Sequence, residues 1–212
     1  MKLLSRSGSS AAYRCRIALN LKGIDAEVVN LRDGEFYEAP YLAINPQGRI
    51  PTLITDDGPI SQSMAILEYL DEVQPAPPFL PTAPIDRAHA RAVAQIVVAD
   101  VHPLQNSGTL RLLAEDHGIG AAGQRSWAQT WIARGLAACE ALLTREDHGG
   151  SYAFGATPGL ADICIVPQMR NAGRFSVDTT CLPRLTAITA ACLEHPAFAA
   201  AHPDRHPDPD AK

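Results

Sequence analysis

The chain has 212 residues, of which 46% are hydrophobic and 19% are charged, and its formal net charge is -5 at pH 7. This composition is typical of a globular protein with one large domain or two small ones. A negative net charge provides no cationic surface for nucleic acid or for an anionic membrane, and no apolar run has the length of a membrane span. We therefore expect neither nucleic acid nor membrane as a partner.

The cysteines and histidines indicate a reduced chain without a metal centre. The five cysteines are scattered and lack both CxxC spacing and metal-ligand spacing. An odd number of such thiols, together with an N-terminus that lacks the apolar core of a signal peptide, predicts a cytoplasmic protein. The pair Asp100 with His102 lies before a proline at a helix junction, and the pair His202 with His206 lies in the tail without a third ligand, so we predict no metal site.

The first eighty residues alternate between strands and helices. The expected elements are a strand over 2–4, a helix that runs to about residue 22, a strand over 26–31, an irregular helical stretch around 36–43, strands at 52–55 and 59–60, and a helix over 63–73. Gly23 is a helix stop, and the Asp56-Asp57-Gly58 turn joins two strands into a hairpin. This order of elements predicts a small sheet covered by helices, with a right-handed βαβ crossover.

The rest of the chain is predicted to be helical. Residues 74–84 carry five prolines, which exclude a regular helix or a central strand, and we place a domain boundary there. Helices are expected over 85–101, 104–115, 124–143, 160–172 and 182–193. The ending AHPDRHPDPDAK is polar and rich in proline, and we expect it to be a frayed tail. The predicted domains are thus an α/β domain over 1–80 and an all-helical domain over 85–212.

Three short segments carry the residues on which a function can be argued. Ser9 and Ser10 stand where the first strand turns into the first helix, and unpaired backbone N–H groups and the positive end of the helix dipole at that point favour an anion such as a thiolate. The alternative is that these serines only cap the helix.

The other two segments allow both a functional and a structural reading. Ile50-Pro51 precedes a strand, where a cis bond would aim the backbone of Ile50 into a site for an extended peptide; the alternative is an ordinary trans proline. Gln62-Ser63 begins a helix and can receive a carboxylate, or can simply cap it. Glutathione carries a thiol, a peptide backbone and an α-carboxylate, so the three segments together match it.

Four stretches give a more specific indication. The stretches SSAAYRCRIALNLKGI, NPQGRIPTL, ISQSMAILEYLDE and HPLQN resemble the zeta class of glutathione transferases, a class that includes bacterial maleylacetoacetate and maleylpyruvate isomerases. The resemblance extends from Lys2 to about Pro196. It implies a thioredoxin-like N-terminal domain, an all-helical C-terminal domain, a homodimer and glutathione as cofactor.

The resemblance also implies roles for individual residues. It places the glutathione thiolate at Ser9 and Ser10, and a substrate carboxylate at Arg174. A guanidinium fork suits a carboxylate because it offers two parallel N–H donors and keeps its charge near neutral pH. The residues implied for glutathione are Gln47, Ile50, Gln62 and Ser63, with Gln105 and Asn106 of the helical domain near the same pocket.

The chain departs from the family pattern at three positions. Ala11 stands where many members carry cysteine, which removes any redox role of a protein thiol at this site. Gly8 stands where an arginine is usual, so a second cationic anchor for a dicarboxylate is absent there, and Arg6 or Arg111 would be the substitutes. Gly159 replaces a serine or threonine before the helix at 160–172, for which we expect a small loss of stability.

These observations predict a glutathione-dependent cis–trans isomerase acting on a small maleyl-type dioxo acid from aromatic catabolism. Two other hypotheses stay open. One is a more general glutathione transferase that displaces halide from α-halo acids, and the other is a non-catalytic scaffold that retains the fold.

Overall fold

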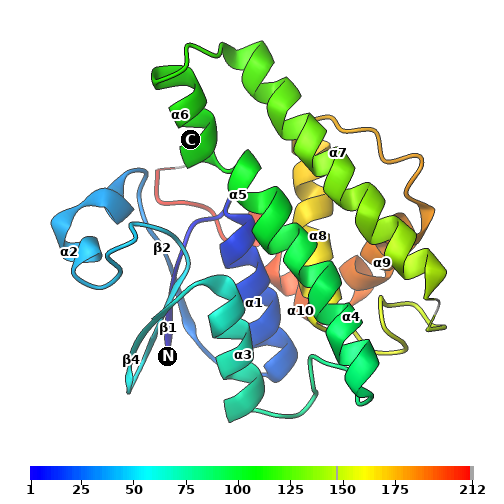
Figure 1. The fold of residues 1–212 in the computed structure, drawn as a ribbon. Helices are drawn as coiled ribbons and strands as arrows, with labels where there is room; N and C mark the ends of the chain where they lie inside the picture. Colours follow the sequence, from blue (N-terminus) through cyan, green and yellow to red (C-terminus); the bar gives the residue numbers. More distant parts are fainter. Residues whose placement is uncertain (147, 211–212) are drawn as a thin grey trace. The chain divides into compact units, whose positions relative to one another are not determined.

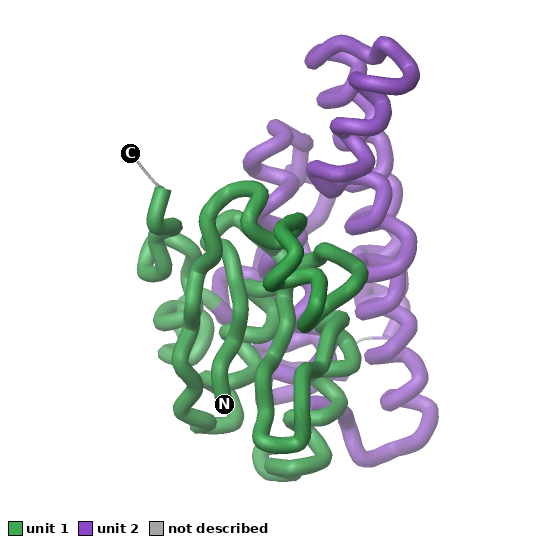
Figure 2. Tube along the Cα trace, turned by 90° about the vertical axis from the view of Figure 1, so that its left-hand side faces the viewer, with its two compact units in different colours: residues 1–78, 193–212 green, residues 79–192 purple. Residues whose placement is uncertain are grey.

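The computed structural model describes residues 1–146 and 148–210 (Figure 1). The chain forms two compact units, one made of residues 1–78 with 193–212 and the other of residues 79–192 (Figure 2). The division between them falls inside the proline-rich segment 74–84. Within the described part of the chain, no helix is long and apolar enough to cross a membrane.

The first unit is built on a four-stranded mixed sheet. Its strands are β1 (Lys2–Ser5), β2 (Glu27–Asn30), β3 (Thr52–Thr55) and β4 (Gly58–Ser61), in the spatial order β2-β1-β3-β4. Strand β1 pairs in parallel with β2 and antiparallel with β3, and β3 and β4 form the expected hairpin. The order of elements predicts such a small sheet, and the fold is the thioredoxin-like arrangement that the family resemblance implies.

Helix α1 (Ser10–Lys22) is the central helix of this unit. Nine consecutive residues from Ala11 to Leu19 are buried, since α1 packs against both α3 (Ser63–Val73) and α10 (Pro196–Ala201) (Figure 1). Gly23 ends α1 in the left-handed conformation at φ 63°, where its N–H bonds back to the carbonyls of Leu19 and Asn20. The sequence signal for the end of this helix is confirmed.

A short helical segment lies between β2 and β3. It consists of the 3-10 turn η1 (Glu35–Tyr37) and helix α2 (Ala39–Leu42). Tyr41 of α2 is buried with Leu4 and Leu31, and Phe36 and Ile50 pack against this cluster. This cluster holds the segment that leads to β3, and so fixes the position of the backbone before Pro51.

The end of the chain differs from the frayed tail that its composition predicts. The described part returns to the first unit, where Asp208 Oδ1 accepts the backbone N–H of Ser7 at 2.7 Å and the Pro203 carbonyl accepts the Ser7 hydroxyl at 2.9 Å. Arg6 lies 3.3 Å from Asp208 and 3.4 Å from Asp210. These long-range pairs fix a segment whose polar residues suggested fraying. Residues 211–212 of the predicted tail lie outside the described residues.

The second unit consists of helices. They are α4 (Pro84–Gln95), the π-helical turn η2 (Ile96–Val101), α5 (His102–Gln105), α6 (Ser107–Glu115), α7 (Ala121–Arg145), α8 (Leu160–Arg174) and α9 (Pro183–Glu194). The predicted helix over 104–115 is interrupted at Asn106, whose side-chain oxygen accepts the Thr109 N–H at 3.0 Å and so starts a new helix. Helix α8 is the most buried of these elements, and its position sets the environment of Arg174.

Close packing explains why a glycine stands at position 159, just before α8. A Cβ at this position would lie 2.6 Å from the carbonyl oxygen of Phe79, which already accepts the Leu160 N–H at 2.8 Å. The small residue therefore lets the chain approach Phe79 closely. The small loss of stability expected for a glycine cap remains a prediction.

Candidate functional site

The strand register brings the three predicted glutathione-binding segments to one edge of the sheet. Leu4 near the end of β1 lies opposite Thr52 at the start of β3, and Thr52 lies opposite Ser61 at the end of β4. The serine pair follows β1, the Ile50-Pro51 bond precedes β3, and Gln62 follows β4. Neighbouring strands lie about 4.8 Å apart, so these segments converge although they are far apart in the sequence.

Ser9 and Ser10 occupy the first positions of α1. Ser9 is the N-cap, with extended φ and ψ, and its hydroxyl oxygen accepts the Ala12 N–H at 3.2 Å. The capping alternative is therefore confirmed for Ser9, and a cap does not prevent its O–H from donating outward. Ser10 is the first helical residue and is half-buried, as Ser9 is. No acidic residue lies in the first turn, so the positive end of the dipole is not neutralised there.

Arg14 adds a positive charge one turn further along α1. It is 2% exposed, and its Nε and Nη1 nitrogens make no hydrogen bond within the described residues. Helical side chains lean toward the N-terminus of their helix, which directs Arg14 back toward the turn of Ser10. A buried cation of this kind is costly without a counter-charge, and it favours an anion at the start of α1.

The loop before β3 is fixed by two buried polar side chains. The Asn45 side-chain amide donates to the Arg49 carbonyl at 2.8 Å and to the Thr52 hydroxyl at 3.0 Å, and the Tyr41 hydroxyl contacts the same two groups. The Ile50–Pro51 bond is cis, as the cis alternative predicts. Asn45 and Tyr41 were not singled out from the sequence, because neither belongs to a motif that binds a ligand.

Gln62 and Gln47 contact one another. Gln62 Nε2 donates to Gln47 Oε1 at 2.7 Å, and both side chains are exposed. Gln62 has φ 71° and ψ 119°, a region that a residue with a side chain seldom adopts and that is typical of functional sites. Ser63, the first residue of α3, is buried at 4% exposure. The structure thus brings two predicted glutathione-binding residues into direct contact beside a helix start.

The predicted residues of the second unit lie on α5, α6 and α8. Gln105 is buried and donates from Nε2 to Gln168 Oε1 of α8 at 3.1 Å. Within the described residues, the other two side-chain atoms, Gln105 Oε1 and Gln168 Nε2, have no hydrogen-bond partner. One acceptor and one donor are therefore open. Asn106 caps α6 through its side-chain oxygen. Gln168 was missed from the sequence because it lies inside an otherwise apolar helix.

Arg174 is the last residue of α8. Burial of part of its side chain, and then the charge of Arg170, lower the pKa of Arg174. Arg6, one possible substitute for an arginine at position 8, is held by Asp208 and Asp210 and by the Leu31 carbonyl at 3.1 Å. Arg6 is therefore not available as a second anchor, and Arg111 pairs with Glu115 along α6.

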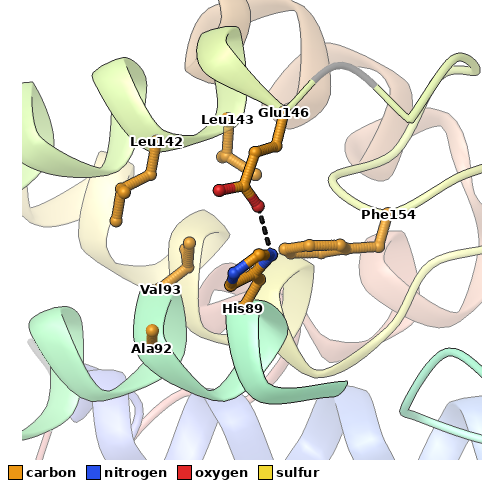
Figure 3. Close-up of a pocket in the computed structure, with 7 residues that line it drawn as sticks. All are labelled: His89, Ala92, Val93, Leu142, Leu143, Glu146 and Phe154. Carbon is orange, nitrogen blue, oxygen red and sulfur yellow. Dashed lines mark ion pairs between the residues drawn. The ribbon is translucent and has the colours of Figure 1, made fainter. Parts of the chain in front are cut away.

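A small pocket inside the second unit does not have the character of a ligand site. Figure 3 shows His89 of α4 facing Glu146, with which it forms an ion pair, beside the ring of Phe154. The remaining lining residues, Ala92, Val93, Leu142 and Leu143, are apolar. The pocket contains none of the predicted site residues. No cluster of three or more potential metal ligands occurs among residues 1–146 and 148–210.

Two of the buried cysteines are poor nucleophiles. None of the five cysteines forms a disulfide, and four of them are buried. Burial raises the pKa of Cys139 to about 12 and also raises that of Cys192. A thiol with a raised pKa holds little thiolate at neutral pH and is a poor nucleophile. Cys139 of α7 and Cys192 of α9 are therefore poor candidates for a reactive thiol.

Comparison with known proteins gives the same picture over the whole length. Residues 1–72 match the family model for the N-terminal domain of glutathione S-transferases. A maleylacetoacetate isomerase from Pseudomonas aeruginosa is 45% identical over 216 aligned positions that cover 100% of both chains. The solved holo structure of a maleyl pyruvate isomerase, a bacterial zeta-class glutathione transferase, has 41% identity, a TM-score of 0.96 and full coverage of both chains. A Methylobacterium extorquens maleylacetoacetate isomerase, solved with malonate and glutathione, has 38% identity, a TM-score of 0.94 and covers 98% of each.

Proposed function

Because the chain belongs to the zeta class of the glutathione transferase family, we propose that it is a glutathione-dependent cis–trans isomerase of maleylpyruvate or maleylacetoacetate. The full-length similarity to isomerases of these two acids carries the proposal. Both substrates are dicarboxylates with a conjugated cis double bond, and the same chemistry serves either of them. The proposed role is in the breakdown of aromatic compounds.

The residues of the first unit fit glutathione. The start of α1 supplies a positive dipole end and the Ser9 and Ser10 hydroxyls for a thiolate, and Arg14 adds a buried cation. The contacting side chains of Gln47 and Gln62 offer donors and acceptors to a peptide, as the backbone of Ile50 does. Ser63 at the start of α3 suits the α-carboxylate. All these roles remain proposals for the named residues.

Glutathione, when bound, supplies a thiolate that adds reversibly to the cis double bond, so that rotation becomes possible before the thiol leaves. Ser9 and Ser10 lower the free energy of that thiolate by donating hydrogen bonds to it. Arg174 holds a substrate carboxylate and opposes the negative charge that develops on the substrate. Gln105 and Asn106 are assigned to the glutathione side of the site on the family resemblance.

One alternative activity has a specific observation in its favour. Gly8 carries no cation, and Arg6 is engaged by the C-terminal segment. A glutathione transferase that displaces halide from a small α-halo acid needs the same thiolate and a single carboxylate anchor. This activity is the second candidate.

The proposed homodimer rests on the family resemblance, and the proposed location rests on the scattered cysteines of the chain. We assign a homodimer in the cytoplasm, with no nucleic acid or membrane as partner. Light scattering on the purified protein tests the dimer.

The experiment that tests the activity follows the conversion of maleylpyruvate and of maleylacetoacetate to their trans isomers. We expect conversion with glutathione and none without it, since the chain has no cysteine beside Ser9 and Ser10. S-methylglutathione, which has no free thiol, is the matched control and should not support turnover. Halide release from chloroacetate without isomerisation would favour the transferase, and absence of glutathione binding by calorimetry would leave only a scaffold.

Replacement of Ser9 or Ser10 with alanine is expected to raise the pKa of the bound glutathione thiol. The loss of one hydrogen bond to an anion corresponds to a fall of about tenfold in kcat/KM at neutral pH. Thiolate absorbance measured against pH in the complex reports the pKa directly. If both variants keep the wild-type pH profile, the dipole and Arg14 suffice to hold the thiolate.

A further inference from the structure

The last two turns of α8 carry two arginines on one face. Arg170 and Arg174 are four residues apart, a spacing that places side chains next to one another on a helix. Arg170 is half-buried, and the buried residues Gln168 and Asn171 lie on either side of it in the sequence. The helix thus places the two side chains on one face, where Arg170 is half-buried and Arg174 is exposed.

No acidic side chain neutralises Arg170. Within residues 1–146 and 148–210, Arg170 forms neither an ion pair nor a hydrogen bond. Arg125 of α7 approaches the same end of α8, since its Nη1 lies 3.5 Å from the Ser176 hydroxyl. The next carboxylate along the chain, Asp178, accepts the Thr180 N–H at 2.9 Å. The end of α8 therefore gathers positive charge.

The charges of Arg170 and Arg174 repel one another. Like charges four residues apart destabilise a helix, and the proximity of Arg170 contributes to the lowered pKa of Arg174. The negative end of the helix dipole attracts cations to the last turn of α8. This attraction is weak, and it does not explain why two arginines occur there. An anion that contacts both guanidinium groups would remove the repulsion.

We propose that Arg170 is the second cationic anchor of the substrate site, and that the Arg170–Arg174 pair selects dicarboxylates over monocarboxylates. The inference rests on the proposed function, which places a substrate carboxylate at Arg174. Two positive charges match a dianion, and a planar guanidinium binds a carboxylate through parallel N–H donors. The pair would supply, from within α8, the charge that Gly8 does not provide.

The test measures the binding of malonate, a short dicarboxylate, and of acetate to the glutathione-loaded protein by calorimetry. For Arg170→Gln we expect the Kd of malonate to rise about tenfold, the size of one lost charge-assisted contact, while the Kd of glutathione stays within about twofold. Arg170→Lys keeps the charge and should retain most of the malonate affinity. Arg134→Gln removes an exposed arginine of α7 and serves as the matched control.

In the isomerase assay, Arg170→Gln should raise KM for the dicarboxylate substrate about tenfold and leave kcat within about twofold. Equal affinities of Arg170→Gln and Arg134→Gln for malonate would overturn the proposal, as would an equal loss for malonate and acetate. A protein that binds malonate through Arg170 but does not isomerise either acid would refute the proposed function and retain this inference.

Discussion

Replacing Asp162 with alanine is expected to lower the free energy of unfolding by about 2–5 kcal/mol at neutral pH. Asp162 is 1% exposed in the first turn of α8, where Oδ1 accepts the Ala153 N–H and Oδ2 accepts the Gly159 N–H, both at 2.8 Å. The substitution would leave two buried or partly buried N–H donors without an acceptor. Urea denaturation measures the loss, and Asp116→Ala, at an exposed helix end, should change stability by no more than about 0.5 kcal/mol.

The effect of Asp162 should depend on pH in a defined direction. Burial raises the pKa of Asp162 from 3.8 to about 6, against the opposing effect of its backbone hydrogen bonds. A folded pKa above the unfolded one means that the native state holds the proton more tightly, so the stabilisation is complete below pH 3.8 and is lost as pH rises to about 6. The loss is about 3 kcal/mol, from 2.2 pH units at 1.36 kcal/mol each.

Asp162→Asn provides the reference for this titration, because asparagine has a similar shape and no ionisable proton. The unfolding free energy of the wild type minus that of the variant should fall between pH 4 and pH 6.5 and then level off. A difference that rises with pH would show that the backbone donors, and not burial, dominate the pKa of Asp162. The unfolding free energy of the wild type minus that of Asp116→Asn should not change with pH.

Local patterns in the sequence predict the frame of the site well. The helix over 63–73 has the predicted bounds, and the serine pair, Pro51 and Gln62 lie at strand ends as expected. These features depend on residues near in sequence, such as Gly23 and the Asp56-Asp57-Gly58 turn. These local features lead to the order of the strands in the sheet. The strand order in turn brings the serine pair, the Ile50-Pro51 bond and Gln62 to one edge of the sheet.

Most features that the sequence did not predict depend on contacts between distant residues, whereas the break at Asn106 depends on its local contact with Thr109. The C-terminal segment is ordered because Asp208 meets Ser7, 201 positions away in the sequence. Gln168 meets Gln105 across 63 positions, and Gln47 contacts Gln62 across 15. The polar, proline-rich composition of the last residues predicted a frayed tail. Composition alone does not show that Arg6, far away in the sequence, pairs with Asp208 and Asp210.

The role of Arg174 leads to the largest expected effect on catalysis. Arg174→Ala should lower kcat/KM for a maleyl dicarboxylate about 100-fold, because a bidentate charged contact is lost where charge develops on the substrate. The Kd of glutathione should change by no more than about twofold, since nothing assigns Arg174 to the tripeptide. Steady-state kinetics and calorimetry measure the two quantities separately, with Arg134→Ala as the control for loss of one surface charge.

Two further variants decide what Arg174 contributes. Arg174→Lys keeps the charge but lacks the planar fork, so its activity should lie between those of the wild type and the alanine variant. Arg170→Gln combined with Arg174→Ala should cost less than the product of the two single losses, because both residues are proposed to contact the same dianion and such pairs are not additive. An equal weakening of substrate and glutathione in Arg174→Ala would remove the assigned role, since a carboxylate anchor acts on the substrate alone.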